Sequence, residues 1–405
     1  MYYKLKPQYR LRGWEKLPYA LVDTAQNNRV TFLRKPEFDA LSLCNGRIDC
    51  DLPMIPESIR QLLPRLEKSG VIEACEAGDA ITPKQEYQKH PSRYIKTAHW
   101  SVTGRCNYRC KHCYMSAPDA KYGELSHETV MDMIDQLAEC GVMNVSLTGG
   151  ECLVRKDFPE IVDALLERDI HITQIYSNGA LVSEKLLTAL EERGVRPEFN
   201  MSYDAPGWHD WLRGIDGAEA AVDRAFRLCR ERGFPTGAEL CIHGKNKHLL
   251  REAVKHLGDL GCRSLKTNPI GDVGEWKKNG YGQSVTTEEL FELYLDYIPH
   301  FYEDGMPLSL QLGGFFDTRA SDYLALHPEC QACEYAPYCL GGCRASALDS
   351  NDGTDLMGRD EACCRMLREG YAARVLALMQ KIRPEATCFL LRDPFWQDKA
   401  ATVKR

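Results

Sequence analysis

From residue 97 to residue 303, strand-like and helix-like segments alternate about every 25 to 35 residues. This alternation is typical of βαβ units, in which a helix follows each strand and the strands pair in parallel. Short strands are expected to begin near Trp100, Val142, Ile170, Phe199, Ala238 and Ser264. A closed barrel of this kind needs about 250 residues and eight units, so about 200 residues with six units predict an α/β fold with a partial, open (β/α)6 barrel.

Two regions flank the barrel, which we place at residues 91–303. Residues 1–90 combine a strand pair, YALVD and RVTFLRK, with an expected helix from Pro56 to Ser69 and a strand, VIEAC. This combination predicts a winged-helix-like domain. Residues 304–405 are expected to form a cysteine-rich domain that ends in a helix. A chain of 405 residues is long enough for three such domains.

The amino-acid composition indicates in which cellular compartment the protein functions and which classes of partner it does not bind. Eighteen cysteines, with no apolar signal segment in MYYKLKPQYR, indicate a reducing compartment where thiols serve metals, catalysis or packing. The chain has no run of about 18 apolar residues that would span a bilayer. The net charge of -7 argues against nucleic acid as the main partner, because phosphate contacts need clustered Lys and Arg. We therefore expect a cytoplasmic protein that binds neither membrane nor nucleic acid.

Three cysteines lie close together in CNYRCKHC, directly after the first expected strand: Cys106, Cys110 and Cys113. Reactive groups of β/α barrels lie at the carboxyl ends of the strands. Three thiolates on one loop can hold three corners of a 4Fe–4S cube and leave the fourth iron open to a ligand that is not protein. A zinc knuckle that uses His112 as its fourth ligand is the alternative.

The C-x3-C-x2-C spacing, with Tyr114 next to the last cysteine, resembles the signature of the radical S-adenosylmethionine (SAM) enzymes. The resemblance implies that SAM chelates the open iron and that one electron from the cluster cleaves SAM to a 5'-deoxyadenosyl radical. It further implies that this radical abstracts hydrogen from the substrate. The protein would supply binding, orientation and exclusion of water.

Other strand ends resemble the SAM-binding motifs of these enzymes. Gly149, Gly150 and Glu151 end the second strand and resemble the GGE motif, which holds the SAM ammonium; glycine permits close backbone approach there. Cys152 stands where the family usually has proline, which places a thiol near the active site. The positions that resemble the ribose and methionine contacts are Ser177, Asn178 and Asp204. Ordinary strand-end turns are the alternative for these last three.

The stretch CQACEYAPYCLGGC resembles the SPASM extension of radical SAM enzymes, which binds auxiliary iron–sulfur clusters. Its cysteines and the two that follow are Cys330, Cys333, Cys339, Cys343, Cys363 and Cys364. The resemblance implies that the first three hold one auxiliary 4Fe–4S cluster and that one of the last three is the fourth ligand. Residues 263–329 contain no cysteine, so a second auxiliary cluster is not expected. A zinc ribbon is the alternative.

Strand alternation gives one inference that does not depend on the resemblance. In AELCIHG the apolar residues are expected to face the outer helices, which turns Cys241 toward the barrel lumen between Glu239 and His243. A thiol in the lumen is able to return a hydrogen atom to a substrate radical. Cys241 and Cys152 are therefore candidate catalytic residues, and the alternative is that both are small buried hydrophobic side chains.

Residues 1–90 resemble the PqqD-like recognition element of peptide-modifying radical SAM enzymes, which implies a precursor peptide as the partner. Such domains bind the leader of the precursor as an extra strand. Residues 1–35 carry eight Lys or Arg against two acidic residues, which fits an acidic leader. Residues 36–90 carry six basic and ten acidic residues, which disfavours a DNA-binding winged helix. A further alternative is that residues 1–90 serve only structure or dimerisation.

The sequence therefore predicts a radical SAM maturase of a ribosomally made peptide, served by a flavodoxin- or ferredoxin-type electron donor. An auxiliary cluster that accepts the surplus electron favours formation of a thioether or carbon–carbon crosslink. A peptide epimerase is an alternative, in which Cys241 would return a hydrogen atom to the peptide. A radical SAM enzyme that acts on a small molecule or a folded protein is also compatible with these motifs, and so is a zinc-binding transcription regulator.

Overall fold

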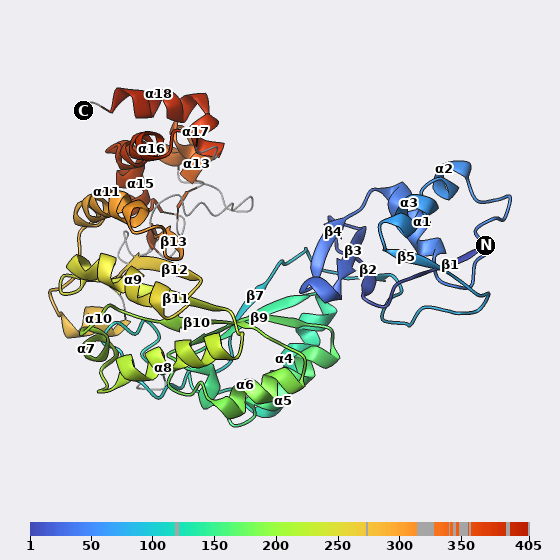
Figure 1. Cartoon of the computed structure of the whole chain (residues 1–405), viewed down its shortest axis with the longest axis horizontal. Coiled ribbons are helices and arrows are strands. Elements are labelled where there is room, and N and C mark those ends of the chain that lie inside the picture. Colours follow the sequence, from blue (N-terminus) through green and yellow to red (C-terminus); the bar gives the residue numbers. More distant parts are fainter. Residues whose placement is uncertain are drawn as a thin grey trace. The chain divides into compact units, whose positions relative to one another are not determined.

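The computed structural model describes residues 1–117, 121–272, 274–313, 328–339, 341–342, 346–347, 355, 358–385 and 389–403. The chain divides into two compact units (Figure 1). The first unit contains Met1–Thr103, Glu124–Ile175 and Glu192–Pro197. The second unit contains the described residues of Gly104–Gly123, Tyr176–Glu191 and Glu198–Arg405.

The central element is a parallel sheet whose strands are hydrogen-bonded in the order β13-β12-β11-β10-β9-β8-β7. The strands are β7 (Ala98–Ser101), β8 (Asn144–Thr148), β9 (His171–Ser177), β10 (Glu198–Ser202), β11 (Thr236–Ile242), β12 (Ser264–Pro269) and β13 (Ser309–Leu312). The predicted α/β fold and its six strands are confirmed. The seventh strand, β13, was not predicted, because its four residues alternate between exposed and half-buried and so give only a weak apolar pattern.

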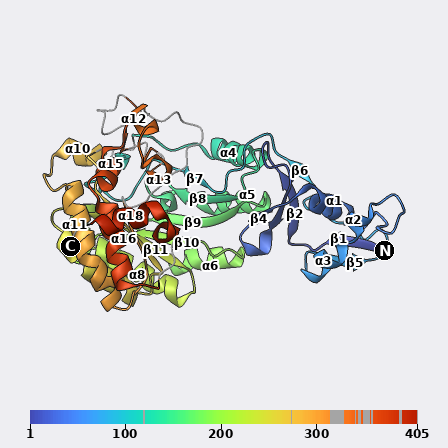
Figure 2. The same ribbon diagram turned by 90° about the horizontal axis from the view of Figure 1, so that it is seen from above.

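Helices connect the strands of this sheet. They are α4 (His127–Glu139), α5 (Phe158–Glu167), α6 (Glu184–Glu192), α8 (Ala218–Glu231), α9 (Leu250–Asp259) and α11 (Thr287–Glu303). Ser126 caps α4 by accepting a hydrogen bond from the Thr129 N–H, and Val130 and Ile134 form its buried face. In the first unit, α4 and α5 run alongside β8 (Figure 2). Helical apolar spacing at Val130 and Ile134 thus decides which face of α4 meets the sheet.

The N-terminal part of the first unit contains two small sheets. One has the order β4-β3-β2-β6, and the other pairs β1 with β5. The strands are β1 (Tyr2–Leu5), β2 (Tyr9–Gly13), β3 (Ala20–Asp23), β4 (Arg29–Phe32), β5 (Ile72–Cys75) and β6 (Gln88–Lys89). The predicted YALVD and RVTFLRK pair is confirmed as the antiparallel pair of β3 and β4.

The single helix that we predicted from Pro56 to Ser69 is wrong, because the structure has two short helices there. They are α2 (Glu57–Arg60) and α3 (Leu63–Lys68), and a third helix, α1 (Lys35–Leu43), precedes them. Pro64 lies in the first turn of α3. Proline has no N–H to bond the preceding turn, so it begins a helix well and does not continue one.

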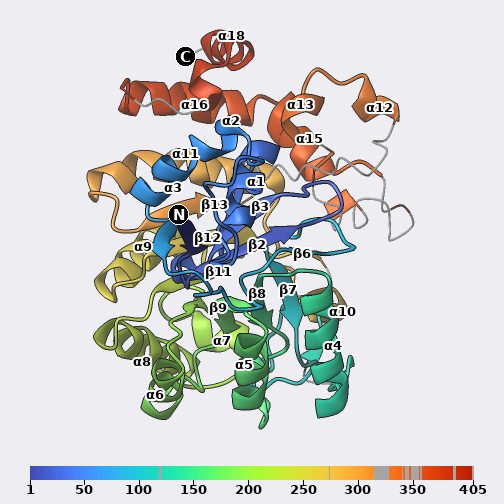
Figure 3. The ribbon, with the colours of Figure 1, turned by 90° about the vertical axis from the view of Figure 1, so that its right-hand side faces the viewer.

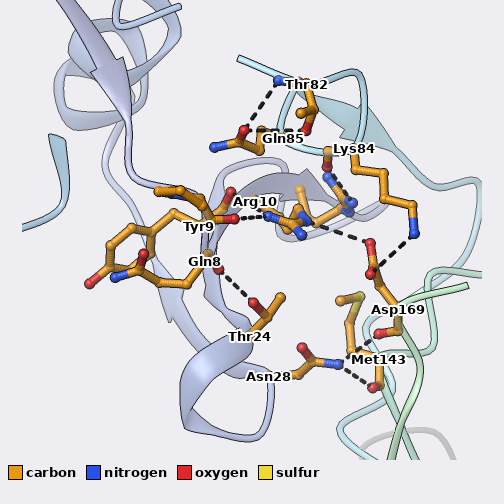
Figure 4. Close-up of polar contacts among 12 residues, drawn as sticks. Gln8, Tyr9, Arg10, Thr24, Asn28, Thr82, Lys84, Gln85, Met143 and Asp169 are labelled. Carbon is orange, nitrogen blue, oxygen red and sulfur yellow. Dashed lines mark hydrogen bonds and ion pairs between the residues drawn. The ribbon is translucent and has the colours of Figure 1, made fainter. Parts of the chain in front are cut away.

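The N-terminal region is attached to the carboxyl end of α5 by polar side chains (Figure 4). Asn28 Nδ2 donates to the carbonyl oxygens of Met143, at 2.7 Å, and Asp169, at 2.8 Å. Lys84 Nζ donates to the Glu167 carbonyl at 2.9 Å and lies 3.4 Å from the Asp169 carboxylate. The last carbonyls of a helix lack intrahelical partners and carry partial negative charge, so Lys84 stabilises the end of α5. Asn28 joins the residues that precede β8 and β9.

A second set of side chains from the N-terminal region binds the carboxyl end of α4. Trp14 Nε1 donates to the Gly141 carbonyl at 3.1 Å, and His90 Nδ1 contacts the Glu139 carbonyl at 3.0 Å. Glu139 ends α4, and Gly141 comes shortly before β8. The N-terminal region therefore lies at the amino ends of β8 and β9, one strand length away from the segments that follow these strands.

The C-terminal part of the second unit is helical (Figure 3). Its described helices are α12 (Pro328–Gln331), α13 (Ala336–Cys339), α15 (Glu361–Arg368), α16 (Tyr371–Ile382), α17 (Phe389–Arg392) and α18 (Pro394–Thr402). α15 and α16 pack against each other and against α11, and α16 also contacts α17 and α18. Within the described ranges, no helix combines the length and the apolar character that a membrane crossing requires.

The attachment of the N-terminal region to α5 yields a stability prediction. Substitution of Asn28 by glycine is expected to lower the free energy of unfolding by about 2 kcal/mol, because a buried and a partly buried carbonyl lose their donor. Glycine keeps the positive φ of 53° that Asn28 adopts. Urea unfolding of the purified protein measures the change.

Asn27→Gly is the matched control. Asn27 has a φ of 51° but an exposed side chain, so its replacement makes the same backbone change without removing a contact. We expect it to alter stability by less than about 0.5 kcal/mol. Equal effects of the two substitutions would contradict a role of the Asn28 side chain.

Candidate functional site

The cysteine loop, residues 104–117, belongs to the second unit and is held there through its backbone. Lys111 N donates to the Leu212 carbonyl at 2.8 Å, and Glu275 N donates to the Cys113 carbonyl at 3.0 Å. A Cβ atom at Gly274 would lie only 2.4 Å from the Cys113 carbonyl oxygen, so the close approach there requires glycine. The two short helices α7 (His209–Arg213) and α10 (Gly274–Asn279) thus fix the loop from two directions.

The three thiols of this loop are half-buried, and each accepts a hydrogen bond from nitrogen. The distances are 3.3 Å from Tyr108 N to Cys106 Sγ, 3.3 Å from Ala117 N to Cys113 Sγ, and 3.8 Å from Arg213 Nη1 to Cys110 Sγ. Hydrogen bonds from N–H groups to cysteine sulfur stabilise the thiolates that ligate iron–sulfur clusters. The donor set of the loop therefore fits a cluster held by three thiolates.

Within the described residues, no three His, Cys, Asp or Glu side chains converge on one point as ligands of a single metal ion. A cube of four irons holds each thiolate on a different iron, so its ligands do not need to converge. His112, the fourth ligand of the zinc alternative, is half-buried, and its Nδ1 has no hydrogen-bond partner in the described part of the chain. Burial and the nearby Arg213 lower the pKa of His112 to about 3, so its ring is neutral.

Asn178 connects the end of β9 to the cysteine loop. Its Nδ2 donates to Asn107 Oδ1 at 2.7 Å and lies 3.9 Å from Cys106 Sγ. Its Oδ1 accepts from the Ala180 N–H at 3.0 Å, and the preceding Ser177 accepts from a backbone N–H in the same turn. Ser177 and Asn178 are both buried. The structure therefore brings this predicted pair to the loop that carries the cysteines.

Asp204, the next predicted SAM contact, is fully enclosed. Its carboxylate lies 2.6 Å from Arg213 Nε and 3.1 Å from His209 Nδ1, and it accepts from the Cys241 N–H at 3.2 Å. Burial opposes its ionisation, but Arg213 and His209 outweigh this effect and hold the pKa of Asp204 well below its usual value. Because its oxygens are taken up by these neighbours, the arrangement favours a positioning role: Asp204 orients Arg213, which donates to Cys110.

Sequence reasoning missed Arg213 and His209. Both follow Asp204 within the stretch DAPGWHDWLRG, and α7 turns their side chains back onto the Asp204 carboxylate. The available signal was four chargeable residues within ten positions after a predicted strand. Only the turn between β10 and α7 shows that they meet.

The GGE segment follows β8 in the first unit. Gly150 N donates to the Thr103 carbonyl at 2.8 Å, and a Cβ at Gly149 would lie 2.5 Å from the same oxygen. Glu151 is 1% exposed and accepts from the Leu153 N–H at 3.1 Å. The glycines thus allow two strand ends to touch, and the turn continues into η3 (Cys152–Val154).

The two candidate catalytic cysteines differ in their surroundings. Cys152 is fully buried, and burial together with Glu151 raises its pKa well above the usual value. Cys241 is half-buried on β11, where it packs against a cluster that contains Leu212 and Trp276. Burial and the Asp204 carboxylate raise the pKa of the Cys241 thiol, which keeps it protonated. The burial of Cys152 favours a packing role, whereas Cys241 keeps a partly accessible thiol.

Two further predictions concern the position of Tyr114 and the alternation of side chains along β11. Tyr114 is 67% exposed, at the edge of the cysteine loop. On β11, Leu240 and Ile242 are buried while Glu239 and Cys241 are half-buried, which is the predicted alternation, although His243 is also fully buried.

Among the described cysteines of the C-terminal region, Cys330, Cys339, Cys363 and Cys364 lie on the short helices α12, α13 and α15, and Cys333 lies between α12 and α13. A hydrogen bond between the Cys363 and Cys339 thiols, and burial, raise the pKa of Cys363. Burial raises the pKa of Cys364 to about 11, and the neighbouring Cys330 adds to this shift. Arg368 Nη2 lies 3.8 Å from Cys333 Sγ. The structure therefore brings these five cysteines into one neighbourhood, whereas Cys343 lies outside the described residues.

The buried Asp204–Arg213 pair yields the second prediction. Asp204→Asn is expected to destabilise the protein by about 3 kcal/mol, because it leaves the guanidinium buried without its counter-charge. Urea unfolding under anaerobic conditions measures this loss. Asp216→Asn removes an exposed carboxylate just beyond α7 and should change little. A similar loss in both variants would argue against a special role of the buried pair.

Comparison with known proteins agrees with this site. Residues 100–257 match the family model described as the radical SAM superfamily. Curated relatives include the Fe-coproporphyrin III synthase of Methanosarcina barkeri, 32% identical over 42% of this chain and 45% of the relative. They also include AlbA, the subtilosin biosynthesis protein of Bacillus subtilis, 26% identical over 44% of this chain and 40% of the relative. The matched segments thus span less than half the length of these relatives.

Solved structures of low identity share the fold. A crystal structure of Streptococcus suis SuiB bound to precursor peptide SuiA has a TM-score of 0.56 at 13% identity, covering 77% of this chain and 73% of SuiB. Native anSMEcpe with bound AdoMet has a TM-score of 0.57 at 15% identity, covering 72% of this chain and 100% of that protein. Residues 100–257 of this chain therefore match the radical SAM superfamily, and the chain shares the fold of a solved structure with bound AdoMet.

Proposed function

We propose that this protein is a radical SAM maturase that modifies a ribosomally made precursor peptide. The observation that carries the proposal is the cysteine loop, in which three thiols accept N–H donors while α7 and α10 hold the backbone. Relatives whose names refer to peptide substrates support the choice of substrate: AlbA, the PqqA peptide cyclase of Granulibacter bethesdensis, and SuiB with its bound precursor peptide.

In this proposal Cys106, Cys110 and Cys113 hold the cluster that binds SAM. The turn Gly149–Glu151 and the pair Ser177–Asn178 hold SAM itself, and Tyr114 lies at the edge of the site. The cluster and SAM, when bound, supply one-electron reduction and hydrogen abstraction from the substrate. Arg213 donates to the sulfur of Cys110, and the buried Asp204 keeps it in position.

The auxiliary cluster is proposed to use Cys330, Cys333 and Cys339. We assign Cys363 as the fourth ligand, because its thiol is hydrogen-bonded to that of Cys339. Arg368 contributes a positive charge and an N–H donor beside Cys333, which favours the thiolate form. A cluster at this place would accept the electron that an oxidative crosslinking reaction releases.

Leader binding is proposed for the edge of the N-terminal sheet. β4 is the last strand in the order β4-β3-β2-β6, and Phe32 on this strand is 46% exposed. An unpaired edge strand offers N–H and C=O groups to an extended peptide, and Phe32 offers an apolar contact. The leader would therefore dock as a fifth strand beside β4.

The basic excess of residues 1–35 gives less support to leader binding than its count suggests, because several of these charges are used internally. Arg10 lies 3.5 Å from the Asp169 carboxylate, and Lys4 lies 2.6 Å from that of Asp79. Arg12 is 4% exposed, and its guanidinium donates to backbone carbonyls, among them that of Lys84 at 2.9 Å. These basic residues thus mainly form contacts within the N-terminal region, and Arg10 contacts the neighbouring Asp169.

A second candidate function is modification of a tetrapyrrole. The observation that favours it is the 32% identity to the Fe-coproporphyrin III synthase, higher than the identity to AlbA. In that case the N-terminal region would be a structural part of the enzyme and would bind no leader.

The proposed function predicts a product on a peptide encoded beside the gene. Reconstituted enzyme is incubated anaerobically with SAM, dithionite and this peptide, and the peptide is analysed by mass spectrometry. Loss of two hydrogens indicates a crosslink, whereas unchanged mass with deuterium from solvent at an α-carbon indicates epimerisation. Cys113→Ala should lose product formation and about four iron atoms per chain, because the loop then lacks one ligand of its cluster. If the enzyme cleaves SAM but leaves the peptide unmodified, the proposal that it modifies this peptide is refuted.

The chemistry at Cys241 is tested separately with Cys241→Ala. If the thiol returns a hydrogen atom to the substrate, the variant should still cleave SAM but lose at least 90% of the epimerised product, about a tenfold loss. Cys229→Ala is the control, since Cys229 is a fully buried thiol in α8. Full product formation by the Cys241 variant would leave crosslinking as the only proposed chemistry.

A further inference from the structure

A group of aromatic and basic side chains lies next to the cysteine loop in the second unit. We call it the aromatic–basic site, and its members are Lys111, Trp211, His243, Lys245, Trp276 and Tyr281. Lys111 comes from the cysteine loop itself, between two of its cysteines. Trp211 lies on α7, and His243 and Lys245 lie in the turn after β11. Trp276 lies on α10, and Tyr281 follows that helix. The site is therefore built at the carboxyl ends of strands, where reactive groups of this fold lie.

The rings of this site form a connected cluster. Trp211 lies 6.4 Å from Trp276 and 6.0 Å from Tyr281, and Trp276 lies 5.0 Å from Tyr281, all as centroid distances. Trp276 is 2% exposed and donates to Ser284 Oγ at 2.8 Å. Its ring is thus locked by packing and by a hydrogen bond, which gives the site a rigid apolar wall.

Two lysines lie over these rings, and neither has a carboxylate partner among the described residues. Lys111 Nζ is 5.5 Å from the Trp211 centroid and 5.2 Å from that of Tyr281, and Lys245 Nζ is 5.3 Å from Trp211. Both side chains are half-buried. Among the residues that the structure describes, neither forms a salt bridge. A ring face attracts an ammonium group but does not neutralise it, so two positive charges remain uncompensated beside an apolar wall.

His243 adds a hydrogen-bond donor with no acceptor. Its Nδ1 accepts from the Lys245 N–H at 3.2 Å, which places the ring proton on Nε2. The side chain is 0% exposed, and within the described residues its Nε2 has no hydrogen-bond partner. Burial lowers the pKa of His243 to about 4, so the ring is neutral near pH 7 and Nε2 is an N–H donor. A buried donor without a partner indicates a missing acceptor.

We propose that the aromatic–basic site binds a carboxylate group of the substrate, supplied by an aspartate or glutamate side chain of the precursor peptide. The carboxylate would accept charge-assisted hydrogen bonds from Lys111 and Lys245 and a further bond from His243 Nε2. The rings would cover the methylene groups of the acidic side chain. This inference rests on the proposed function for the source of the carboxylate, and it places an acidic residue of the peptide within reach of the cysteine loop.

The test compares two probes that differ only in charge, N-acetylglutamate methylamide and N-acetylglutamine methylamide. Holoenzyme with SAM but no reductant is titrated with each probe, and binding is followed by tryptophan fluorescence and by saturation-transfer NMR. We expect the glutamate probe to bind at least tenfold more tightly, because only its charged group pairs with the lysines. Equal affinities, or no binding of the glutamate probe, would overturn the proposal.

Substitutions test whether Lys111 and Lys245 cause the preference for the glutamate probe. Lys245→Gln and the double variant Lys111→Gln with Lys245→Gln should reduce the preference for glutamate to less than about twofold, while Lys245→Arg should retain it. Lys247→Gln is the matched control, since Lys247 is two residues from Lys245 and already pairs with Glu289 at 2.9 Å. Iron content shows whether the substitution at Lys111 leaves the cluster intact. A preference that survives in the double variant would refute the assignment.

A third probe separates the two sources of a carboxylate. Coproporphyrin III carries propionate groups, so porphyrin binding that needs both lysines, without any preference for the glutamate probe, would overturn the peptide source. The glutamate preference together with an unmodified peptide in the mass-spectrometric assay would instead refute the proposed function and leave the carboxylate site in place.

Discussion

The buried ion pair between Asp204 and Arg213 is the interaction on which the arrangement of the site depends. A charge this deep inside a protein is stable only when it is paired, so the end of β10 and α7 must stay together. The same pair reaches two further elements: Arg213 donates to Cys110, and Asp204 accepts from the backbone N–H of Cys241 on β11. One pair of opposite charges thus positions the cysteine loop, a helix and a strand with a candidate hydrogen donor.

Within the first unit, the N-terminal region is attached near the ends of α4 and α5 by polar side chains, and Trp14, Ala20 and Val22 also form an apolar cluster with Met143. His90 and Lys84 contact the carbonyls of Glu139 and Glu167, which end α4 and α5, and Trp14 and Asn28 donate to carbonyls two residues beyond these helices. These contacts lie at the amino ends of β8 and β9, whereas Gly149 and Glu151 follow β8. A five-residue strand is about 17 Å long, so roughly this distance separates the two places within the unit.

Much of the fold could be predicted because its signals are local. The strands at β7 to β12 are short apolar segments flanked by turns, and the cysteine spacing in CNYRCKHC needs no tertiary information. β13 was missed, because a short strand at the edge of a sheet has no buried apolar face. The helix predicted from Pro56 to Ser69 failed at Pro64, where apolar periodicity continues although the backbone hydrogen bonds cannot.

The sequence by itself determined the spacing of the candidate ligands, since three thiols at C-x3-C-x2-C spacing and a GGE segment are properties of consecutive residues. Only the tertiary structure decided how other residues serve that chemistry. It enclosed Asp204 in an ion pair with Arg213, buried Cys152, and collected Lys111, Lys245 and His243 around Trp211. The physical reason is that burial and charge pairing depend on which strand ends meet in space, and residues separated by more than a hundred positions meet there.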